Sequence, residues 1–418
     1  MYEKITLPNG VRILTERVPD IRSATLGIWA ATGSRHEAAA ENGAAHFIEH
    51  MVFKGTSTQS AAEIAQRMDA IGGQVNAFTT KECTCFYARA LDSHLSEALD
   101  ILCSMFFDAR FSQEDVETER GVILEEIGMY QDTPDDLCSE RLAAAVYKGT
   151  PLARPILGTP ATLKKMTGPW LKDYMKAHYT PEHIVVSLSG SFSPELVGEI
   201  KDRFSEMSPG AHQKEKGAAY QQAFTRKKKA IEQNHLIVAF PSIPLQSPDR
   251  FGMQLLSSML GGGMSSRLFQ EVREKRGLCY SVYTYGAGHE DTGLFAIYTA
   301  LNREMEGEAL RTIVETVRDF TERGADQGEL DRAREQSKAN VLMGLESTTA
   351  RMNHLARSEL YQDKILTPDE IIAAYDAVTL EDIRRLAAET FDWSRVSLSA
   401  VGRVAEEEAY REALASFS

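Results

Sequence analysis

The sequence lacks any apolar run long enough to cross a membrane. No window of its 418 residues approaches the roughly 18 consecutive apolar residues of a transmembrane helix. Residues 1–7 (MYEKITL) have neither the apolar core of a secretory signal nor the Arg- and Ser-rich helix of a mitochondrial presequence, so we expect no targeting segment here. These two absences predict a cytoplasmic protein, or the mature form of a cleaved one, without a membrane partner.

Cysteine is scarce and positive charge is in deficit. The cysteines are odd in number and low in density, which is typical of a reducing compartment (Cys83, Cys85, Cys103, Cys138 and Cys279). The 46 Lys and Arg residues against 60 Asp and Glu give a net charge of −14. This balance argues against nucleic acid as a partner, because phosphate contacts need clustered cations. It favours basic peptides instead, and the short basic run at 226–229 is interpreted as the solvated edge of a strand.

What the sequence does contain is the pentapeptide His46-Phe47-Ile48-Glu49-His50. Residues three and four apart on a helix are neighbours, so His46 and His50 can bind one metal ion while Glu49 reaches the same region. A zinc ion with two imidazole ligands and a third ligand keeps a position for water and acidifies it. A carboxylate beside that water can act as a general base. The order His-x-x-Glu-His is a known inverse of the commoner zinc-protease motif.

The same pentapeptide would also fit the solvated face of an amphipathic helix. Its flanks favour the metal, because residues 43–45 (GAA) and 51–53 (MVF) are small or apolar and indicate a partly buried helix. Buried ionisable groups need partners or a metal ion. The context of the motif therefore predicts a metal site.

The second half of the chain weakly repeats the first. Residues 186–190 (VSLSG) resemble 396–400 (VSLSA), and 128–133 resemble 344–348. Between the halves the sequence is polar and carries Pro and Gly, as a linker does. We predict a metal-binding domain at 1–210, a linker at 211–224 and a homologous domain without a metal at 225–418.

Each half mixes strand patterns with helix patterns. The fold class predicted for each is α+β, a mostly antiparallel sheet covered on one face by helices. In the first half we expect helices over 41–53, 60–71, 92–107 and 112–132 and strands over 4–7, 11–17, 23–31, 74–79, 83–90 and 183–190. In the second half we expect strands near 234–240, 280–287, 292–300 and 395–401 and long helices near 304–323 and 327–345.

The two halves differ where the metal motif lies. Opposite the pentapeptide, the second half has uncharged residues (Gln254, Ser257 and Ser258). In the helix predicted over 112–132, Glu126 lies by an apolar stripe where a solvated glutamate is unexpected, and Glu119 is two turns earlier on nearly the same face. We predict Glu126 as the third metal ligand and Glu119 as a carboxylate that orients a ligand. Glu125, about 100° round the helix, is the alternative to Glu126.

Together these motifs resemble the pitrilysin family of inverzincin metallopeptidases. The resemblance rests on 46–50 and on Glu126 within 119–126 and covers essentially the whole chain. The opening residues 7–11 (LPNGV) are most similar to the processing-peptidase branch of that family. The resemblance implies one zinc ion per subunit, two homologous α+β domains, a closed chamber built from two subunits, and endopeptidase action on peptides or unfolded segments.

Two further segments resemble substrate-binding parts of the family. The strand containing Gln74, Val75, Asn76, Ala77 and Phe78 is similar to the one whose exposed edge pairs with substrate backbone, although an internal hairpin strand is the alternative. In the second half, 273–280 resembles the segment whose Arg and Tyr reach over the zinc. The resemblance implies that Arg273 holds a substrate carbonyl and that Tyr280 donates to the oxyanion of the tetrahedral intermediate.

The predicted activity is that of a zinc-dependent metalloendopeptidase in which Glu49 takes a proton from water and passes it to the leaving amine. One chain carries both the metal motif and the Arg/Tyr pair, which favours a homodimer. The alternative function is a non-catalytic peptide-binding or structural subunit with the same fold, and the alternative role of the zinc is structural. The choice among zinc, manganese and cobalt stays open. So do the physiological substrate and the peptide bond that is cleaved. The run Gly261–Gly263 is interpreted as a flexible loop.

Overall fold

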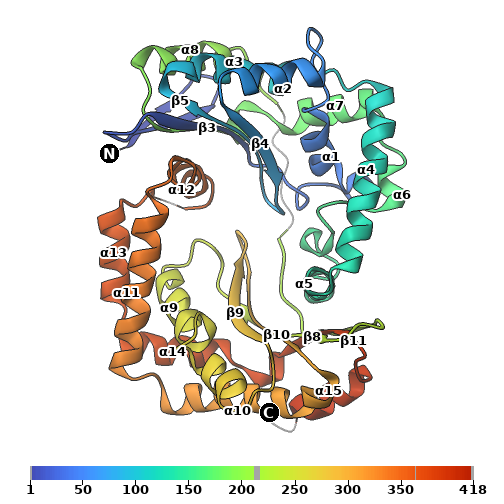
Figure 1. Cartoon of the computed structure of the whole chain (residues 1–418), viewed down its shortest axis with the longest axis vertical. Helices are drawn as coiled ribbons and strands as arrows, with labels where there is room; N and C mark the ends of the chain where they lie inside the picture. Colours follow the sequence, from blue (N-terminus) through green and yellow to red (C-terminus); the bar gives the residue numbers. More distant parts are fainter. Residues whose placement is uncertain (1, 211–216, 363, 416–418) are drawn as a thin grey trace. The chain divides into compact units, whose positions relative to one another are not determined.

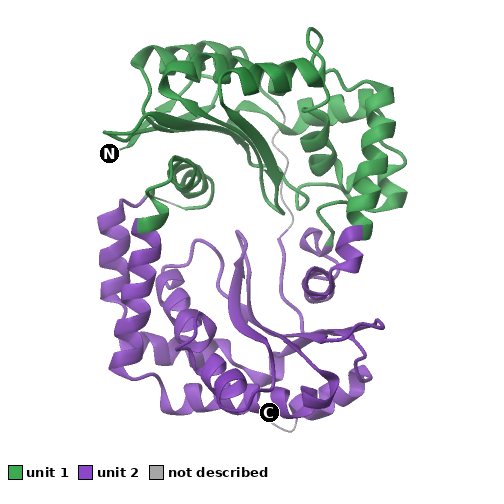
Figure 2. Ribbon diagram, in the orientation of Figure 1, with its two compact units in different colours: residues 1–128, 154–216, 343–365 green, residues 129–153, 217–342, 366–418 purple. Residues whose placement is uncertain are grey.

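The computed structural model describes residues 2–210, 217–362 and 364–415, which form two compact units. Unit 1 comprises 1–128, 154–216 and 343–365, and unit 2 comprises 129–153, 217–342 and 366–418 (Figure 2). Residues 211–216 of the predicted linker lie outside the described residues. Each unit contains one sheet and its own hydrophobic core, so the predicted α+β fold class is confirmed.

The sheet of unit 1 has six strands in the order β1-β2-β6-β3-β5-β4. Neighbours run antiparallel except β2 and β6, which are parallel. Gly10, at φ 103°, closes the turn between β1 and β2. β4 is an edge strand. The strands are β1 Tyr2–Thr6, β2 Arg12–Arg17, β3 Ser23–Ala30, β4 Gln74–Thr79, β5 Thr84–Leu91 and β6 Ile184–Gly190.

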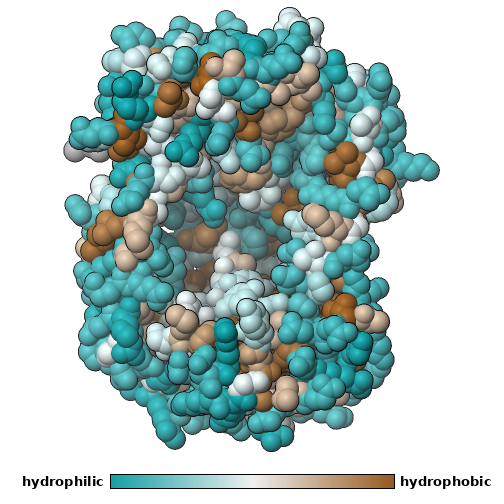
Figure 3. All heavy atoms as spheres, in the orientation of Figure 1, coloured by the Kyte–Doolittle hydropathy of each residue, from teal (hydrophilic) through white to brown (hydrophobic). Residues whose placement is uncertain are grey.

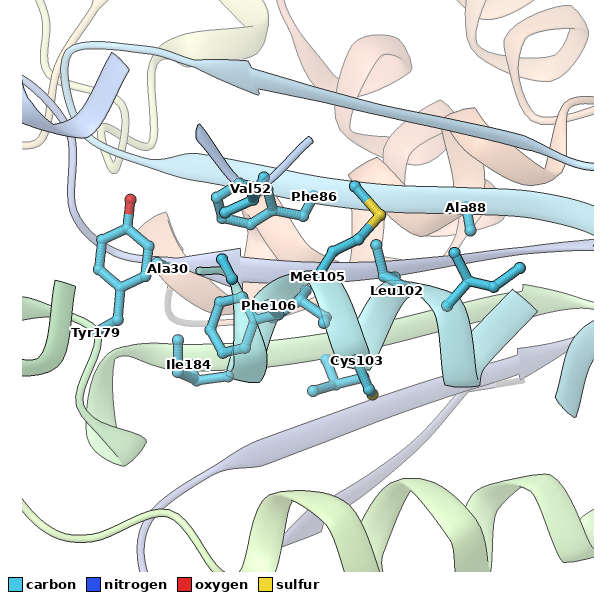
Figure 4. Packing of buried hydrophobic residues seen from close by; sticks show 14 of the residues in the cluster. Ala30, Val52, Phe86, Ala88, Leu102, Cys103, Met105, Phe106, Tyr179 and Ile184 are labelled. Carbon is cyan, nitrogen blue, oxygen red and sulfur yellow. The ribbon is translucent and has the colours of Figure 1, made fainter. Parts of the chain in front are cut away.

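Helices α1, α2 and α3 pack on one face of this sheet, and α7 and α8 pack against α1 and α3 (Figure 1). Figure 4 shows the core beneath α3, where Phe106 meets Phe86 of β5 edge to face with ring centroids 5.8 Å apart. The helices that begin in unit 1 before residue 210 are α1 Ala44–Met51, α2 Ala61–Ala70, α3 Leu95–Asp108, α4 Gln113–Asp132, α6 Pro160–Leu163, α7 Gly168–His178 and α8 Pro194–Ser205.

The sheet of unit 2 has the order β7-β11-β8-β10-β9. Its single parallel pair, β7 with β11, corresponds to β2 with β6, and the other pairs are antiparallel. The internal repeat therefore reflects two sheets of one topology. The elements are β7 Phe224–Lys228, β8 Asn234–Ser242, β9 Ser281–Gly288, β10 Gly293–Leu301, β11 Ser397–Gly402, α9 Arg250–Gly261, α10 Glu306–Arg323, α11 Gln327–Gly344, α13 Pro368–Ala377, α14 Leu380–Thr390 and α15 Glu407–Ala415.

Each unit also contains one helix from the other half of the chain. Helix α12, Thr348–Tyr361, packs on β3 and β6 of unit 1, and helix α5, Pro134–Val146, packs on β8 and β11 of unit 2 (Figures 1 and 2). The compact units thus differ from the continuous ranges 1–210 and 225–418, because a helix belongs to the sheet that buries its face. We call this arrangement the helix exchange.

Helix α12 covers the sheet face opposite α3. Gly27 and Trp29 point to this face, since they alternate along β3 with core residues on the other side. The Trp29 indole Nε1 lies 3.1 Å from the Met352 sulfur, and the Ser187 hydroxyl donates a 2.9 Å hydrogen bond to the Met352 carbonyl. The prediction of helices on one face therefore describes the main layer, and the exchanged helix adds a second.

Each unit is mostly hydrophilic on the face seen in Figure 3, where teal side chains predominate and apolar side chains are scattered. Within the part of the chain that the structure describes, no helix combines the length and apolarity required to traverse a bilayer.

Candidate metal centre

Helix α1 carries the pentapeptide of the predicted metal site. Its apolar side, Phe47, Ile48 and Met51, is fully buried in the core of unit 1 and fixes the rotation of the helix. His46 and His50 lie four residues apart, so both imidazoles emerge on one side. Their ring centroids are 4.7 Å apart, with His46 buried and His50 partly exposed.

A buried carboxylate that the sequence analysis did not identify holds the start of α1. The Glu37 oxygens accept hydrogen bonds from the backbone N–H groups of Gly43 (2.8 Å) and Ala45 (2.9 Å) and from the Asn42 side chain (2.9 Å). Burial raises the pKa of Glu37 to about 7 in spite of these donors. An acidic residue just before a helix start is the one sequence signal that could have indicated this role.

Helix α4 brings a carboxylate, the predicted third ligand, to the two imidazoles. Val116, Glu119, Ile123 and Glu126 fall on one face of α4 at spacings of three and four, and the first three are buried. Glu126 Oε2 lies 3.5 Å from His46 Nε2 and 3.6 Å from His50 Nε2. Glu125, the alternative ligand, is exposed, and the cluster contains Glu126 instead.

The donor set fits zinc. One ligand atom from each of His46, His50 and Glu126 lies within 4.8 Å of the other two. Two ligands of a tetrahedral zinc ion, each about 2.05 Å from the metal, are about 3.4 Å apart. The measured separations from Glu126, 3.5 and 3.6 Å, are close to that value. Two imidazoles and one carboxylate are also a ligand set of known catalytic zinc sites.

The remaining ring nitrogens of the two histidines differ in their surroundings. His50 Nδ1 lies 3.1 Å from Glu119 Oε2, and Glu119 is 3% exposed. A proton on Nδ1, donated to this carboxylate, leaves Nε2 free to bind a metal. Among the described residues, the buried Nδ1 of His46 has no hydrogen-bond partner. Glu119 therefore lies beside His50, where it can orient that predicted ligand, and not beside His46.

Glu49 lies on α1 between the two histidines and is bonded to the edge strand. Its Oε2 accepts a 2.5 Å hydrogen bond from the Thr79 hydroxyl at the end of β4. Burial raises the pKa of Glu49, while this hydrogen bond lowers it by a smaller amount. A carboxylate with a raised pKa beside this cluster accepts a proton more readily than an ordinary carboxylate does.

The pKa values of the three residues in the cluster shift in different directions. Burial and the neighbouring His50 lower the pKa of His46 to about 4. Burial also lowers the pKa of His50, but hydrogen bonds to Glu126 and Glu119 outweigh it and the net shift is upward. The hydrogen bond to His50 lowers the pKa of Glu126. Without metal, His46 is thus neutral and His50 is the first of the two to take a proton as the pH falls.

The predicted substrate strand, Gln74 to Phe78, lies in β4. Among the described residues β4 pairs only with β5, so its other edge presents unpaired backbone groups. β4 is thus the outer strand of a hairpin with β5, and the alternative of a hairpin strand without a substrate stays open. The pairing of a substrate with the free edge stays a prediction.

Arg273 and Tyr280 belong to unit 2 and contact each other. The Arg273 guanidinium lies 5.2 Å from the centre of the Tyr280 ring and 4.7 Å from that of Phe269. Tyr280 is 72% exposed. The structure therefore brings the predicted pair together in unit 2, and their action on a substrate stays a prediction.

Helix α9 is the counterpart of α1 in unit 2 and has a neutral hydroxyl where α1 has the Glu49 carboxylate. The Ser257 hydroxyl lies 2.9 Å from the Thr284 hydroxyl of β9, the same helix-to-edge-strand link that Glu49 and Thr79 make in unit 1. Gly261 is the last residue of α9, where an added Cβ would lie 2.6 Å from the Thr284 methyl group. The interpretation of Gly261–Gly263 as a flexible loop was therefore wrong for Gly261, which ends a helix in close contact with a strand.

Two family models and several proteins named zinc protease match most of this chain. The family model described as Insulinase (Peptidase family M16) matches residues 12–160, and the model described as Peptidase M16 inactive domain matches residues 165–337. A Bacillus subtilis protein named zinc protease YmxG is 42% identical over 408 residues, which cover 97% of this chain and 100% of that protein. A zinc protease of Streptomyces coelicolor is 40% identical over 420 residues, which cover 98% of this chain and 91% of that protein.

Two solved structures share the fold. A peptidase M16 inactive domain from Pseudomonas fluorescens has a TM-score of 0.89 at 21% identity and covers 97% of this chain and 99% of its own. A protease from Helicobacter pylori has a TM-score of 0.89 at 20% identity, and the match covers 96% of this chain and 99% of that protein's chain. The names of the closer sequence relatives identify zinc as the metal that the cluster of His46, His50 and Glu126 fits. The chain belongs to peptidase family M16.

Proposed function

We propose that this protein is a zinc-dependent endopeptidase that hydrolyses peptide bonds in extended or unfolded segments, including presequence-like ones. One observation carries the proposal: the cluster of His46, His50 and Glu126 lies beside Glu49, and Glu49 is bonded to the edge strand β4 through Thr79. Ligands, base and a strand edge able to align a peptide thus converge within unit 1.

The residues of unit 1 divide the reaction between them. His46, His50 and Glu126 hold the metal, and zinc, when bound, supplies a Lewis acid that acidifies water. Glu49 takes the proton of the attacking water and passes it to the leaving amine. Its raised pKa supports this double role, since the group that accepts the proton must also release it.

The free edge of β4 binds the substrate as an added strand. Main-chain pairing recognises an extended backbone rather than a particular sequence, which supports action on unfolded segments. Arg273 holds a substrate carbonyl and Tyr280 donates to the developing oxyanion, as the family resemblance implies. The contact of these two side chains in unit 2 supports a joint role.

The preferred substrates are basic. The net charge of −14 supports this preference, and so does a local feature of unit 2. The carboxylates of Asp135 and Asp136 act on Tyr283, whose pKa is raised by burial and further by these two charges. Carboxylates beside an exposed aromatic ring suit Lys and Arg side chains, through ion pairs and cation–π contacts.

The active assembly is a homodimer that encloses a chamber. The support is the resemblance to the processing-peptidase branch, together with the presence of the metal motif and the Arg/Tyr pair in one chain. Sedimentation of the zinc-loaded protein would give the mass of two chains, and a monomer that cleaves peptides at full rate would contradict this part of the proposal.

The decisive experiment measures cleavage of a quenched basic peptide by wild type and by Glu49→Gln. The variant keeps the three ligands, so we expect unchanged zinc content and a loss of kcat of about 10²–10⁴-fold or more, as for a missing general base. Glu125→Gln, one residue from the ligand Glu126 but exposed, is the matched control and should cleave normally. Activity that survives Glu49→Gln would refute the assignment of the base.

A further inference from the structure

A lysine just beyond α1 contacts the carboxylate that supports the metal ligand His50. Lys54 Nζ lies 2.5 Å from Glu119 Oε1, and the other oxygen of the same carboxylate, Oε2, lies 3.1 Å from His50 Nδ1. The Lys54 side chain is 34% exposed, whereas that of Glu119 is 4% exposed. The two contacts form a chain from an ammonium group through a buried carboxylate to an imidazole.

We propose that Lys54 is a positioning residue of the metal centre, which fixes Glu119 so that Glu119 orients His50 toward the metal. The proposal rests on the proposed function, because it takes His46, His50 and Glu126 to be the zinc ligands. Lys54 does not contact the three predicted ligands themselves and acts only through Glu119.

The need for Lys54 follows from the freedom of a glutamate side chain. The terminal torsion of Glu is broad, so a carboxylate bonded through one oxygen can still turn about its last bond. Lys54 on one oxygen and His50 on the other remove that freedom. Lys54 also compensates the charge of Glu119, since a buried carboxylate needs a cationic or hydrogen-bonding partner.

The backbone around Lys54 is fixed as well. The Lys54 N–H donates a 3.1 Å hydrogen bond to the Met51 carbonyl at the end of α1. The next residue, Gly55, has φ 102°, and its carbonyl accepts a 3.1 Å hydrogen bond from the Arg110 N–H. The turn after α1 is thus bonded to the segment before α4, which places the ammonium group beside Glu119.

The two histidines depend on different supports. His50 has Glu119 and Lys54 behind it, whereas the buried Nδ1 of His46 has no partner among the described residues. Loss of Lys54 should therefore loosen one ligand of three. This predicts weaker zinc binding rather than its abolition.

The test measures zinc dissociation constants by competition with a chromophoric chelator. Outer partners of a metal-bound histidine contribute about 10–100-fold to metal affinity. We expect Glu119→Gln to weaken zinc binding within that range, Lys54→Met to weaken it about tenfold, and Lys54→Arg to restore most of it. Because Lys54 acts through Glu119, the double variant should bind zinc no more weakly than Glu119→Gln alone.

The matched control is Lys4→Met, which removes a 2.8 Å ion pair with Glu359 elsewhere in unit 1 and should leave zinc affinity unchanged. Melting of the metal-free proteins shows whether each variant folds, and Lys54→Gln, which keeps a hydrogen-bond donor, replaces the Met variant if that one melts early. Zinc affinity of the Lys54 variant equal to that of the control, or losses that add in the double variant, would overturn the role of Lys54. A wild type that binds no zinc would overturn the proposed function instead.

Discussion

Thr79 donates a 2.5 Å hydrogen bond to Glu49 and so connects the edge strand of unit 1 with the carboxylate beside the metal ligands. The same position of unit 2 has a neutral bond between Ser257 and Thr284. Both units thus have a hydrogen bond between this helix and the edge strand, but only the one in unit 1 includes a carboxylate. In unit 1 this link can adjust the acidity of the base.

Thr79→Val should move the acid limb of the activity profile to higher pH. The Thr79 hydrogen bond lowers the pKa of Glu49 against the effect of burial, so its loss raises that pKa further, and the base is then protonated over a wider range. A hydrogen bond to a charged group contributes about 1.5–3 kcal/mol, which is enough to displace the limb measurably. The measurement is kcat/KM against pH, with Thr79→Ser as the control that keeps the hydroxyl. Coincident limbs for the Val and wild-type proteins would contradict the prediction.

Zinc affinity should fall as the pH falls, in two stages. Metal binding requires unprotonated ligands. The pKa of His50 is raised above its ordinary value, so His50 takes a proton first and the apparent Kd then rises about tenfold per pH unit. The pKa of His46 is lowered to about 4, so the dependence steepens only near that pH. Chelator competition at several pH values checks this, and a Kd that does not change between about pH 8 and about pH 5 would disprove it.

Gly27→Ala should destabilise unit 1 by obstructing the exchanged helix. An added Cβ would lie 2.6 Å from the Met352 sulfur and 2.9 Å from Trp29 Nε1, in a region without free space. Overpacking of this kind costs about 1–3 kcal/mol. Met352→Ala alone should cost about 2–5 kcal/mol through a cavity, and the double variant should cost less than the sum because the new methyl group gains room. Hydrogen exchange of α12 measures the effect, and strict additivity would argue against the contact.

Gly128→Ala should stabilise the protein. Gly128 lies within α4, and nothing lies within 4 Å of the position that an added Cβ would occupy. Glycine inside a helix costs about 0.5–1 kcal/mol relative to alanine. Thermal unfolding should therefore shift upward, whereas Gly168→Ala, whose Cβ would meet the Phe111 carbonyl, should lower it. A lower melting temperature for Gly128→Ala would contradict the expectation.

The sequence was informative where one element carries the whole signal. The spacing of His46 and His50 on one helix, and of Glu119 and Glu126 on another, predicts side chains that the structure brings together. The strand predicted over 74–79 has the bounds of β4. Periodicity and local turn chemistry are properties of short segments, and they can be read without knowledge of the fold.

Features that depend on two distant segments were not predictable in this way. The contact of Lys54 with Glu119 depends on how the turn after α1 meets α4. Helix α12 was not predicted at all, since its buried face includes the polar residues Thr348 and Ser358 and gives no clear apolar stripe. An apolar stripe also shows that a helix is covered, but it does not identify the sheet that covers it.

The helix exchange has a consequence for how the chain can be divided. A fragment that ends before β7 would contain α5 without the β8–β11 surface that buries Cys138, Leu142 and Val146, and it would leave Trp29 without α12. The complementary fragment would have the opposite defect. Neither half is then a free-standing domain. Together, however, the two halves supply both the sheet that buries α5 and the helix α12 that covers Trp29. Co-expressed halves should therefore reassemble by fragment complementation, because each polypeptide supplies the missing cover of the other.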